Sequence, residues 1–327
     1  MWPFNKKTTI AASGILAGAT DHHSHILPGV DDGVETMDEA LRILAAYETL
    51  GIKALWLTPH IMEDIPNSPQ KLHKRFEELK ATYNGCIQLH LAAEYMTDNL
   101  LCKLLQETPP RFRGEVVEDR RGEKSPAEAT MGEGDKTTEP QGEISLNSPS
   151  FKKREYPKGE GDRTTEQQGE ISLNSPSFEK REYPKGEGDR TPKQDPPHLL
   201  PIGNKGKHIL VETSYYNAPM RMNETLQLIK SLGYQPLLAH PERYMYLDNA
   251  EYAKLHSQGI KFQLNLASLA GGYGPAVKKK AHWLLNNGLY NVAGTDLHSQ
   301  ESISLITKCK LSKQHIEQVE RLLHNSI

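Results

Sequence analysis

The sequence predicts an α/β fold built from seven strand–helix units. Short apolar runs alternate strictly with amphipathic helical patterns, an order that is typical of a parallel sheet with helices packed outside it. Histidine or carboxylate side chains recur at the points where the apolar runs end. Seven such units favour a closed but irregular barrel over an open sheet.

The first predicted strand begins at Thr20 and ends in two histidines. His23 and His25 are two residues apart, so a strand places both imidazoles on one side. His22 and Ser24 then face the other side. A histidine pair of this kind is more often incidental than functional, and its meaning depends on whether later strands also end in metal-ligand side chains.

The next elements alternate as a barrel requires. Thr36 and Glu39 form a T-x-x-E capping box that predicts the start of a helix, and Gly51 predicts its end. The pattern then predicts strands at Lys53–Thr58 and Cys86–Ala92 and helices at Ser68–Tyr83 and Asp98–Gln106.

The alternation breaks after residue 110 and resumes near residue 200. The later strands are predicted at His208–Thr213, Gln235–Ala239, Ile260–Asn265 and Asn291–Gly294. The later helices are predicted at Arg221–Leu232, Asn249–Ser257, Ala276–Asn287 and Ser312–His324.

The intervening segment has the composition of a disordered insertion. It is rich in Gly, Pro, Glu, Lys, Ser and Thr, and it holds too few apolar residues to offset the entropy of ordering. Asp135–Gly161 recurs as Asp162–Gly188, a period of 27 residues. A tolerated loop is the favoured interpretation. The alternative is that Tyr156 and Tyr183 of the two repeats become phosphorylated and occupy the site in cis.

Four parts of the chain follow from these patterns. They are an N-terminal extension (1–19), the first part of the barrel (20–110), the low-complexity insertion (111–197) and the second part of the barrel (198–327).

Composition restricts the class of protein. The 327 residues carry a formal net charge of −3, which argues against a polyanion-binding surface and a nucleic-acid partner. The cysteines Cys86, Cys102 and Cys309 are scattered, which suits a reducing, cytoplasmic compartment. None of them is followed by arginine six positions on, so the phosphate-binding loop of cysteine-dependent phosphatases is absent. No apolar run is long enough for a membrane span, and the weak apolar run after Lys6 and Lys7 only faintly resembles a signal peptide.

Candidate metal ligands lie at or just past the carboxyl ends of the predicted strands. In a parallel barrel these ends meet on one face, where active sites are found. Histidine together with carboxylate, and no thiolate, suits Mn, Fe, Zn or Mg. The predicted ligands are His23, His25, Asp32, His60, Glu94, Glu212, His240, Asp296 and His298.

Such a set predicts hydrolytic chemistry at phosphorus. Two or three cations held a few Å apart can lower the pKa of a bridging water and screen both oxygens of an in-line phosphoryl displacement. Arg243, three residues after His240, is suited to bind phosphate oxygens. Asp296 or a nearby histidine such as His298 could protonate the leaving group.

At these residues the sequence resembles a known family. The segments HHSHILPGVDDG, TPH, AAEY, LVE, LAHPERY and GTDLH occur in this order. They are similar to those of the polymerase-and-histidinol-phosphatase (PHP) family. Within it they resemble the metal-dependent protein-tyrosine phosphatases of bacterial capsule and exopolysaccharide biosynthesis. LPGVDDG combined with LAHPERY is the specific part of the match.

The resemblance implies a distorted (β/α)7 barrel with a trinuclear site, usually manganese. All nine predicted ligands fall on the family's ligand positions, with Glu94 as a bridging ligand and Arg243 as the phosphate-binding arginine. The implied substrate is a tyrosine-phosphorylated protein, the autokinase that controls polysaccharide export. An oligomer is also compatible with the family.

Two departures and two alternatives accompany this resemblance. His22 stands where the family usually has an aliphatic residue, and no arginine occurs in Ser299–Ile306, where some relatives carry one. A small-molecule phosphatase of the histidinol-phosphate type remains an alternative function. A non-catalytic barrel or scaffold is a second alternative, although the complete ligand set speaks against it.

Overall fold

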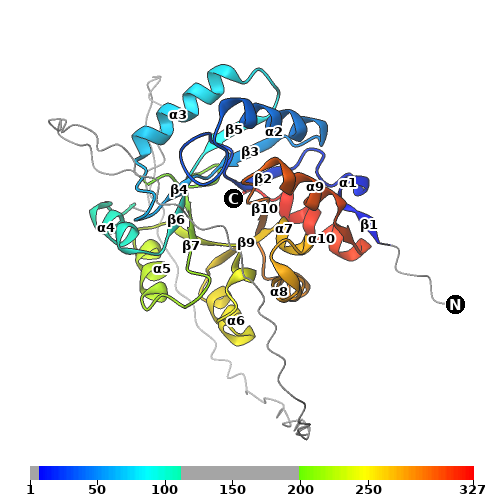
Figure 1. Cartoon of the computed structure of the whole chain (residues 1–327). Coiled ribbons are helices and arrows are strands. Elements are labelled where there is room, and N and C mark those ends of the chain that lie inside the picture. The colour runs from blue at the N-terminus through cyan, green and yellow to red at the C-terminus, as the bar shows by residue number, and fades with distance from the viewer. Residues whose placement is uncertain (1–6, 112–198) are drawn as a thin grey trace, which may run out of the picture. The chain divides into compact units, whose positions relative to one another are not determined.

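The computed structural model describes residues 7–111 and 199–327, and the α/β class predicted from the sequence is confirmed there. In Figure 1, the longer helices lie outside the strands. The main strands are β2 (Thr20–Ser24), β3 (Ala54–Leu57), β4 (His60–Ile61), β5 (Gln88–Leu91), β6 (Glu94–Met96), β7 (His208–Glu212), β8 (Gln235–Ala239), β9 (Lys261–Asn265) and β10 (Val292–Gly294).

The predicted helices all occur in the predicted order. The α-helices that follow β2 are α2 (Met37–Thr49), α3 (Pro69–Thr82), α4 (Asn99–Glu107), α5 (Met222–Ser231), α6 (Asn249–Ser257), α7 (Leu266–Ala270), α8 (Gly274–Asn286), α9 (Gln300–Lys308) and α10 (Lys313–Leu323). Of these, α7 and α9 were not predicted by the sequence pattern. Thr36 caps α2 by accepting a hydrogen bond from Glu39 N, and Gly51 follows the helix with a φ of 79°.

The main strands form two sheets in which every pair is parallel. One sheet has the order β10-β9-β8-β7-β6-β4, and the other has the order β2-β3-β5. β4 and β6 continue the directions of β3 and β5 after short breaks. Pro59, which has no N–H to donate, lies between β3 and β4 and accounts for the first break.

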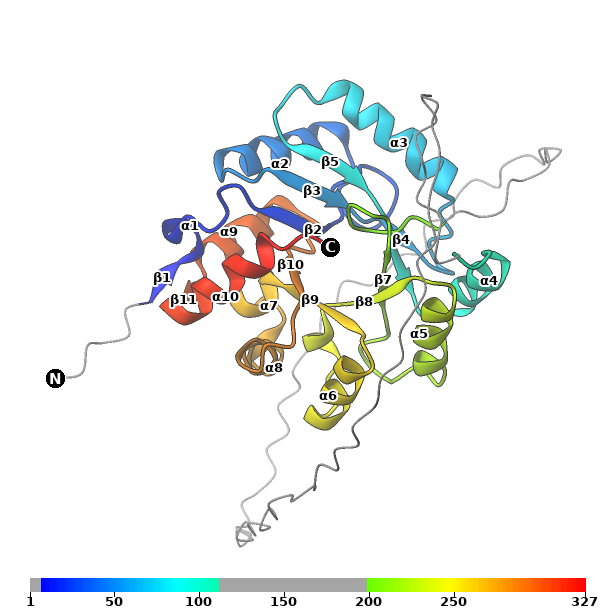
Figure 2. The same cartoon turned by 180° about the vertical axis from the view of Figure 1, so that it is seen from behind.

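The two sheets adjoin each other at both ends. At one end the chain itself passes from β3 to β4 and from β5 to β6, and hydrogen bonds continue between these two segments, from Ala92 N to Leu57 O at 2.9 Å and from Glu94 N to Pro59 O at 3.1 Å. At the other end His25 N donates to Leu297 O at 3.0 Å, beside an isolated parallel bridge between Ser24 and Leu297. Figures 1 and 2 both show β2 beside β10. The carboxyl ends of the two sheets therefore face a common region.

The N-terminal segment is part of the folded core. The strand β1 (Thr8–Thr9) pairs in the antiparallel sense with β11 (Lys310–Leu311), and the short helix α1 (Ile10–Ser13) follows it. Ile10, Ile15 and Leu16 are buried. The sequence pattern did not predict this pairing because two-residue strands have no readable periodicity.

Both flanks of the predicted insertion are anchored to the fold. Arg111 N donates to Leu232 O at 2.9 Å, and Leu200 N donates to the hydroxyl of Tyr95 in β6 at 2.8 Å. The predicted repeat and its disorder concern residues outside the described ranges. Within those ranges no helix is long and apolar enough to cross a membrane.

Candidate metal centre and active site

All nine predicted ligand residues converge at the carboxyl ends of the strands. They form three groups in which one potential ligand atom from each residue lies within 4.8 Å of the others. The groups are His25, Asp32, His60 and His298; His23, Glu94, His240 and Asp296; and His60, Glu94 and Glu212. His60 and Glu94 each belong to two groups, so the site is continuous.

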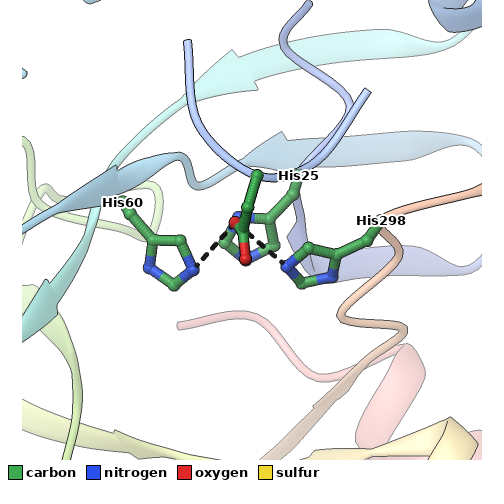
Figure 3. A group of neighbouring side chains, drawn as sticks. His25, His60 and His298 are labelled. Carbon is green, nitrogen blue, oxygen red and sulfur yellow. Dashed lines mark ion pairs between the residues drawn. The ribbon is translucent and has the colours of Figure 1, made fainter. Parts of the chain in front are cut away.

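The first group lies on the open side of the site. His60 Nε2 is 3.5 Å and His298 Nε2 is 3.6 Å from Asp32 Oδ1 (Figure 3). The ring of His25 stacks on that of His298 with their centroids 4.1 Å apart. The side chain of Asp32 is 52% exposed, whereas that of His25 is fully buried. A substrate can therefore approach from the Asp32 side.

Glu94 lies at the centre of the site and contacts four histidines. Its Oε2 is 3.1 Å from His23 Nε2 and 3.3 Å from both His25 Nε2 and His60 Nδ1. Its Oε1 is 3.0 Å from His240 Nε2. Oε2 of Glu94 and Nδ1 of His60 are buried and have no hydrogen-bond partner. Buried polar atoms without hydrogen bonds are costly, and a divalent cation between them removes that cost.

Outer hydrogen bonds aim the histidines inward. Nδ1 of His23 bonds to Gln263 Oε1 at 3.0 Å, and Nδ1 of His25 bonds to Asp31 Oδ2 at 2.9 Å. Nδ1 of His298 bonds to the carbonyl oxygen of Asp296 at 3.0 Å. Because each of these partners is an acceptor, Nδ1 carries the proton and Nε2 is left to face the cluster. This arrangement is the one that metal-binding histidines require.

Two of these outer partners were not predicted as site residues. Asp31 is not among the predicted ligands, yet besides bonding to His25 it accepts from His60 N at 3.1 Å. Gln263 also accepts from His240 N at 3.1 Å and is fully buried. A polar residue in the middle of an apolar strand was the available signal for Gln263.

The charges of the site shift the pKa values of its members. Burial opposes protonation of His23, but the charges of Glu94 and Asp296 outweigh it and raise the pKa of His23 to about 9. Burial likewise opposes ionisation of Glu94 and Asp296, but the surrounding histidines hold the pKa of both carboxyls well below their usual range. Both carboxylates are therefore ionised, and an ionised Asp296 does not suit the role of proton donor to the leaving group.

Backbone strain coincides with the site. His240, with φ of 33°, and Asp296, with φ of 51°, are the two non-glycine residues with positive φ in the described ranges. Such conformations persist only where surrounding contacts hold them, and they concentrate at functional positions. Asp296 N donates to His23 O at 2.8 Å, which helps to hold this turn.

Arg243 borders the cluster of predicted ligands. Its Nη1 lies 3.0 Å from Asp296 Oδ2. Its guanidinium lies between two aromatic rings, 4.0 Å from the centroid of Tyr215 and 4.2 Å from that of Tyr273. The two rings hold the guanidinium plane at the edge of the site, with its remaining N–H groups available to an anion.

Comparisons with known proteins find one matching family and several relatives. The model of a family described as "Capsular polysaccharide synthesis, CpsB/CapC" matches residues 19–111 and 198–322. The chain is 29% identical over 110 residues to the tyrosine-protein phosphatase CpsB of Streptococcus pneumoniae, covering 32% of this chain and 45% of the relative. It is 28% identical over 135 residues to the tyrosine-protein phosphatase YwqE of Bacillus subtilis, covering 37% and 53%. The alignments span about half the length of these relatives.

A solved structure shares the fold. It belongs to a study of YwqE from Bacillus subtilis and CpsB from Streptococcus pneumoniae, described as unique metal-dependent tyrosine phosphatases. The TM-score is 0.56 at 17% sequence identity, over 94% of this chain and 95% of the other. At that identity the match is evidence for the fold alone.

Proposed function

The chain belongs to the CpsB/CapC family of capsular polysaccharide synthesis proteins, and we propose that it is a metal-dependent protein-tyrosine phosphatase. The observation that carries this proposal is the position of Glu94, which contacts four histidines in a site bordered by Arg243. The relatives' names agree with this chemistry.

The three groups of side chains would hold up to three divalent ions. Mn²⁺ is the proposed metal, and Fe, Zn and Mg suit the same mixed histidine and carboxylate set. Glu94 and His60 would each be shared between neighbouring ions, since each belongs to two groups. Bound cations would supply a water of lowered pKa and screen the charge of the phosphoryl group.

Arg243 is proposed to bind the phosphate. Its contact with Asp296 and its position between Tyr215 and Tyr273 fix the guanidinium before substrate arrives. A guanidinium that is already in place stabilises the negative charge on the equatorial phosphate oxygens in the transition state, because the protein does not have to reorganise during the reaction. Tyr273 is 38% exposed and could also contact the ring of the phosphotyrosine.

His298 is proposed to assist the leaving phenolate. Its side chain is 32% exposed and lies on the open side of the site, where a leaving group would depart. Its Nδ1 is held by the carbonyl oxygen of Asp296, so Nε2 would carry the proton given to the phenolate, and it could do so only while that atom is not bound to a metal ion. Asp296 is proposed as a ligand rather than as the acid, since its carboxyl stays ionised.

We also propose that the two sheets close into one distorted (β/α)7 barrel. The support is that β3 and β5 of one sheet lead directly into β4 and β6 of the other, and that at the opposite edge His25 N donates to Leu297 O. The barrel would comprise residues 20–110 and 198–327, interrupted by the insertion at 111–197. A cytoplasmic location and a tyrosine-phosphorylated kinase of polysaccharide export as substrate belong to the same proposal.

The test is turnover of three substrates by the purified full chain. Phosphotyrosyl peptide, p-nitrophenyl phosphate and histidinol phosphate are compared with added Mn²⁺ and with a chelator. The proposal expects hydrolysis of the peptide to exceed that of histidinol phosphate and to stop on chelation. Preference for histidinol phosphate would favour the small-molecule alternative, and bound metal without any turnover would favour a non-catalytic barrel.

A further inference from the structure

A surface pocket of about 620 Å³ lies between α7, α8 and α9 and is strongly cationic. Four lysines line it, against a single carboxylate from Glu301. The lysines come from four places in the chain: Lys7 before β1, Lys278 in α8, Lys308 at the end of α9 and Lys310 in β11. We call it the lysine pocket.

The fold brings these like charges together without neutralising them. Pairing of β1 with β11 sets Thr9 opposite Lys310 and so places Lys7 near it. Lys278 extends over Gly271 toward the carbonyl oxygen of Ala270, at 3.5 Å. In the part of the chain that the structure describes, Lys7, Lys308 and Lys310 make no ion pair. Like charges held together are costly, and an anionic ligand offsets that cost.

The positive charge of the lysine pocket also affects the pKa of His282, a neighbouring side chain. Burial is the main cause that lowers the pKa of His282 to about 4, and the charges of His315, Lys278 and Lys7 lower it further. The positive charges of Lys278 and Lys7 therefore reach His282, which does not line the pocket.

A chain of contacts connects the lysine pocket to the candidate active site. Tyr273 packs on Arg243 at one end, and Gly272 precedes it in the chain. A Cβ placed on Gly272 would lie 2.9 Å from Leu305 Cδ2, so Leu305 packs directly over this loop. Leu305 lines the pocket. Tyr273 and Leu305 are 38% and 40% exposed, and they form an apolar surface between Arg243 and the lysine pocket.

We propose that the lysine pocket binds carboxylate side chains of the substrate protein, beyond its phosphotyrosine. The proposal rests on the proposed phosphatase function. The phosphate would bind at Arg243, apolar residues would cross Tyr273 and Leu305, and acidic residues would reach the four lysines. The pocket would thereby select phosphotyrosyl segments that are flanked on one side by Asp or Glu.

The test measures binding of labelled peptides to the full chain with Mn²⁺ present, by fluorescence anisotropy. Each peptide carries a non-hydrolysable phosphotyrosine analogue, an apolar spacer and three glutamates, placed either before or after the analogue. Matched peptides carry three glutamines instead. In one of the two directions the acidic peptide is expected to bind about tenfold more tightly than its glutamine partner at low salt, and the difference should shrink as salt screens it.

Two variants make the test specific. Lys308→Glu should abolish the preference for the acidic peptide. Lys254→Glu is the matched control, because Lys254 is also exposed in the last turn of a helix, α6, but lies outside the pocket. It should leave the preference unchanged.

The outcomes separate this inference from the function on which it rests. Equal binding of acidic and glutamine peptides, or equal losses in both variants, would overturn the lysine pocket as a subsite even if the protein hydrolyses phosphotyrosine. Binding of anionic lipid vesicles that Lys308→Glu abolishes, without any peptide preference, would assign the pocket to a membrane surface and would also overturn it. An acidic preference in a protein without turnover would support the subsite and reject the phosphatase.

Discussion

Arg243 Nη1 lies 3.0 Å from Asp296 Oδ2, while the other oxygen of Asp296 lies 3.4 Å from Nε2 of both His23 and His25. Asn265 Nδ2 also donates to Oδ2, at 2.8 Å. One oxygen of this carboxylate is thus held by hydrogen bonds, and the other faces the cluster of histidines. The same side chain links the phosphate-binding arginine to the metal centre.

Removing the guanidinium should therefore reduce catalysis without emptying the site. We expect Arg243→Ala to lower kcat/KM for a phosphotyrosyl peptide by roughly 100-fold, since it removes a fixed cation that faces the transferred group. Arg243→Lys should not restore the rate, because an ammonium cannot stack between two rings and bind two oxygens. Arg221→Ala, at an exposed position, is the control. Loss of bound metal in Arg243→Ala would contradict the assigned role.

The outer hydrogen bonds should set metal affinity. Gln263→Leu removes the acceptor shared by His23 Nδ1 and His240 N. We expect Mn²⁺ to bind roughly 10- to 100-fold more weakly, with turnover largely recovered at saturating metal. Calorimetric titration of the chelated protein measures this. Gln88→Leu, at an exposed strand position, should change neither quantity. Unaltered affinity in Gln263→Leu would show that His23 needs no such partner.

One face of β2 should contribute to the stability of the fold, and the other should contribute to metal binding. His22 is buried on the face opposite His23, and its Nδ1 bonds to Ala293 O at 3.1 Å. His22→Leu should lower the free energy of unfolding by about 1 kcal/mol and leave the metal content unchanged. His23→Gln should lower the metal content. Urea unfolding and metal analysis of both variants test this assignment. Loss of metal in His22→Leu but not in His23→Gln would show that His22, and not His23, faces the metal site.

The stability of the metal-free protein should depend on pH in a defined direction. Against burial, Glu94 and Asp296 raise the pKa of His23 to about 9 from the ordinary 6.5. The folded state holds this proton more tightly than the unfolded state does, so protonation of His23 stabilises the fold. This contribution to the free energy of unfolding is complete below pH 6.5 and is lost as the pH rises through 9. Its size is about 1.4 kcal/mol per unit of pKa shift. Urea unfolding in chelator should therefore show stability falling over this window.

Metal should reverse that dependence. A cation must displace the proton from His23, so metal binding strengthens as the pH rises. The gain in stability from Mn²⁺ should be larger at pH 8.5 than at pH 6.5, and His23→Gln should weaken both trends. Chelated protein whose stability rises with pH through this window would contradict the assigned environment of His23.

The positions of the candidate ligands could be predicted from the sequence because these residues follow apolar runs that are recognisable as strands. His22 and His23 lie at the end of β2 and His25 just after it, His240 follows β8 directly, and Asp296 lies two residues after β10. Parallel strands bring such ends together, so no tertiary information was needed to place them on one face. Arg243 was predictable for the same reason, as it shares a short loop with His240.

The supporting residues could not be predicted in the same way. Gln263 and Asn265 belong to β9, whose partners are identified only once the strands pair. The lysine pocket depends on β1–β11 pairing between the two ends of the described chain, which leaves no periodic signal. The sequence pattern predicted strands that end at Thr58 and Ala92, and it did not predict the short strands β4 and β6 that follow them, because two or three residues leave no readable periodicity.

The most direct test of the central claim measures bound metal and phosphotyrosine turnover in the same samples of full-length protein. Samples are taken as purified, after chelation and after addition of Mn²⁺. The account predicts two to three ions per chain in active samples, turnover that falls and returns with the metal, and loss of both in Glu94→Gln. Turnover that persists in chelated protein or in Glu94→Gln would contradict a metal-dependent mechanism at this site.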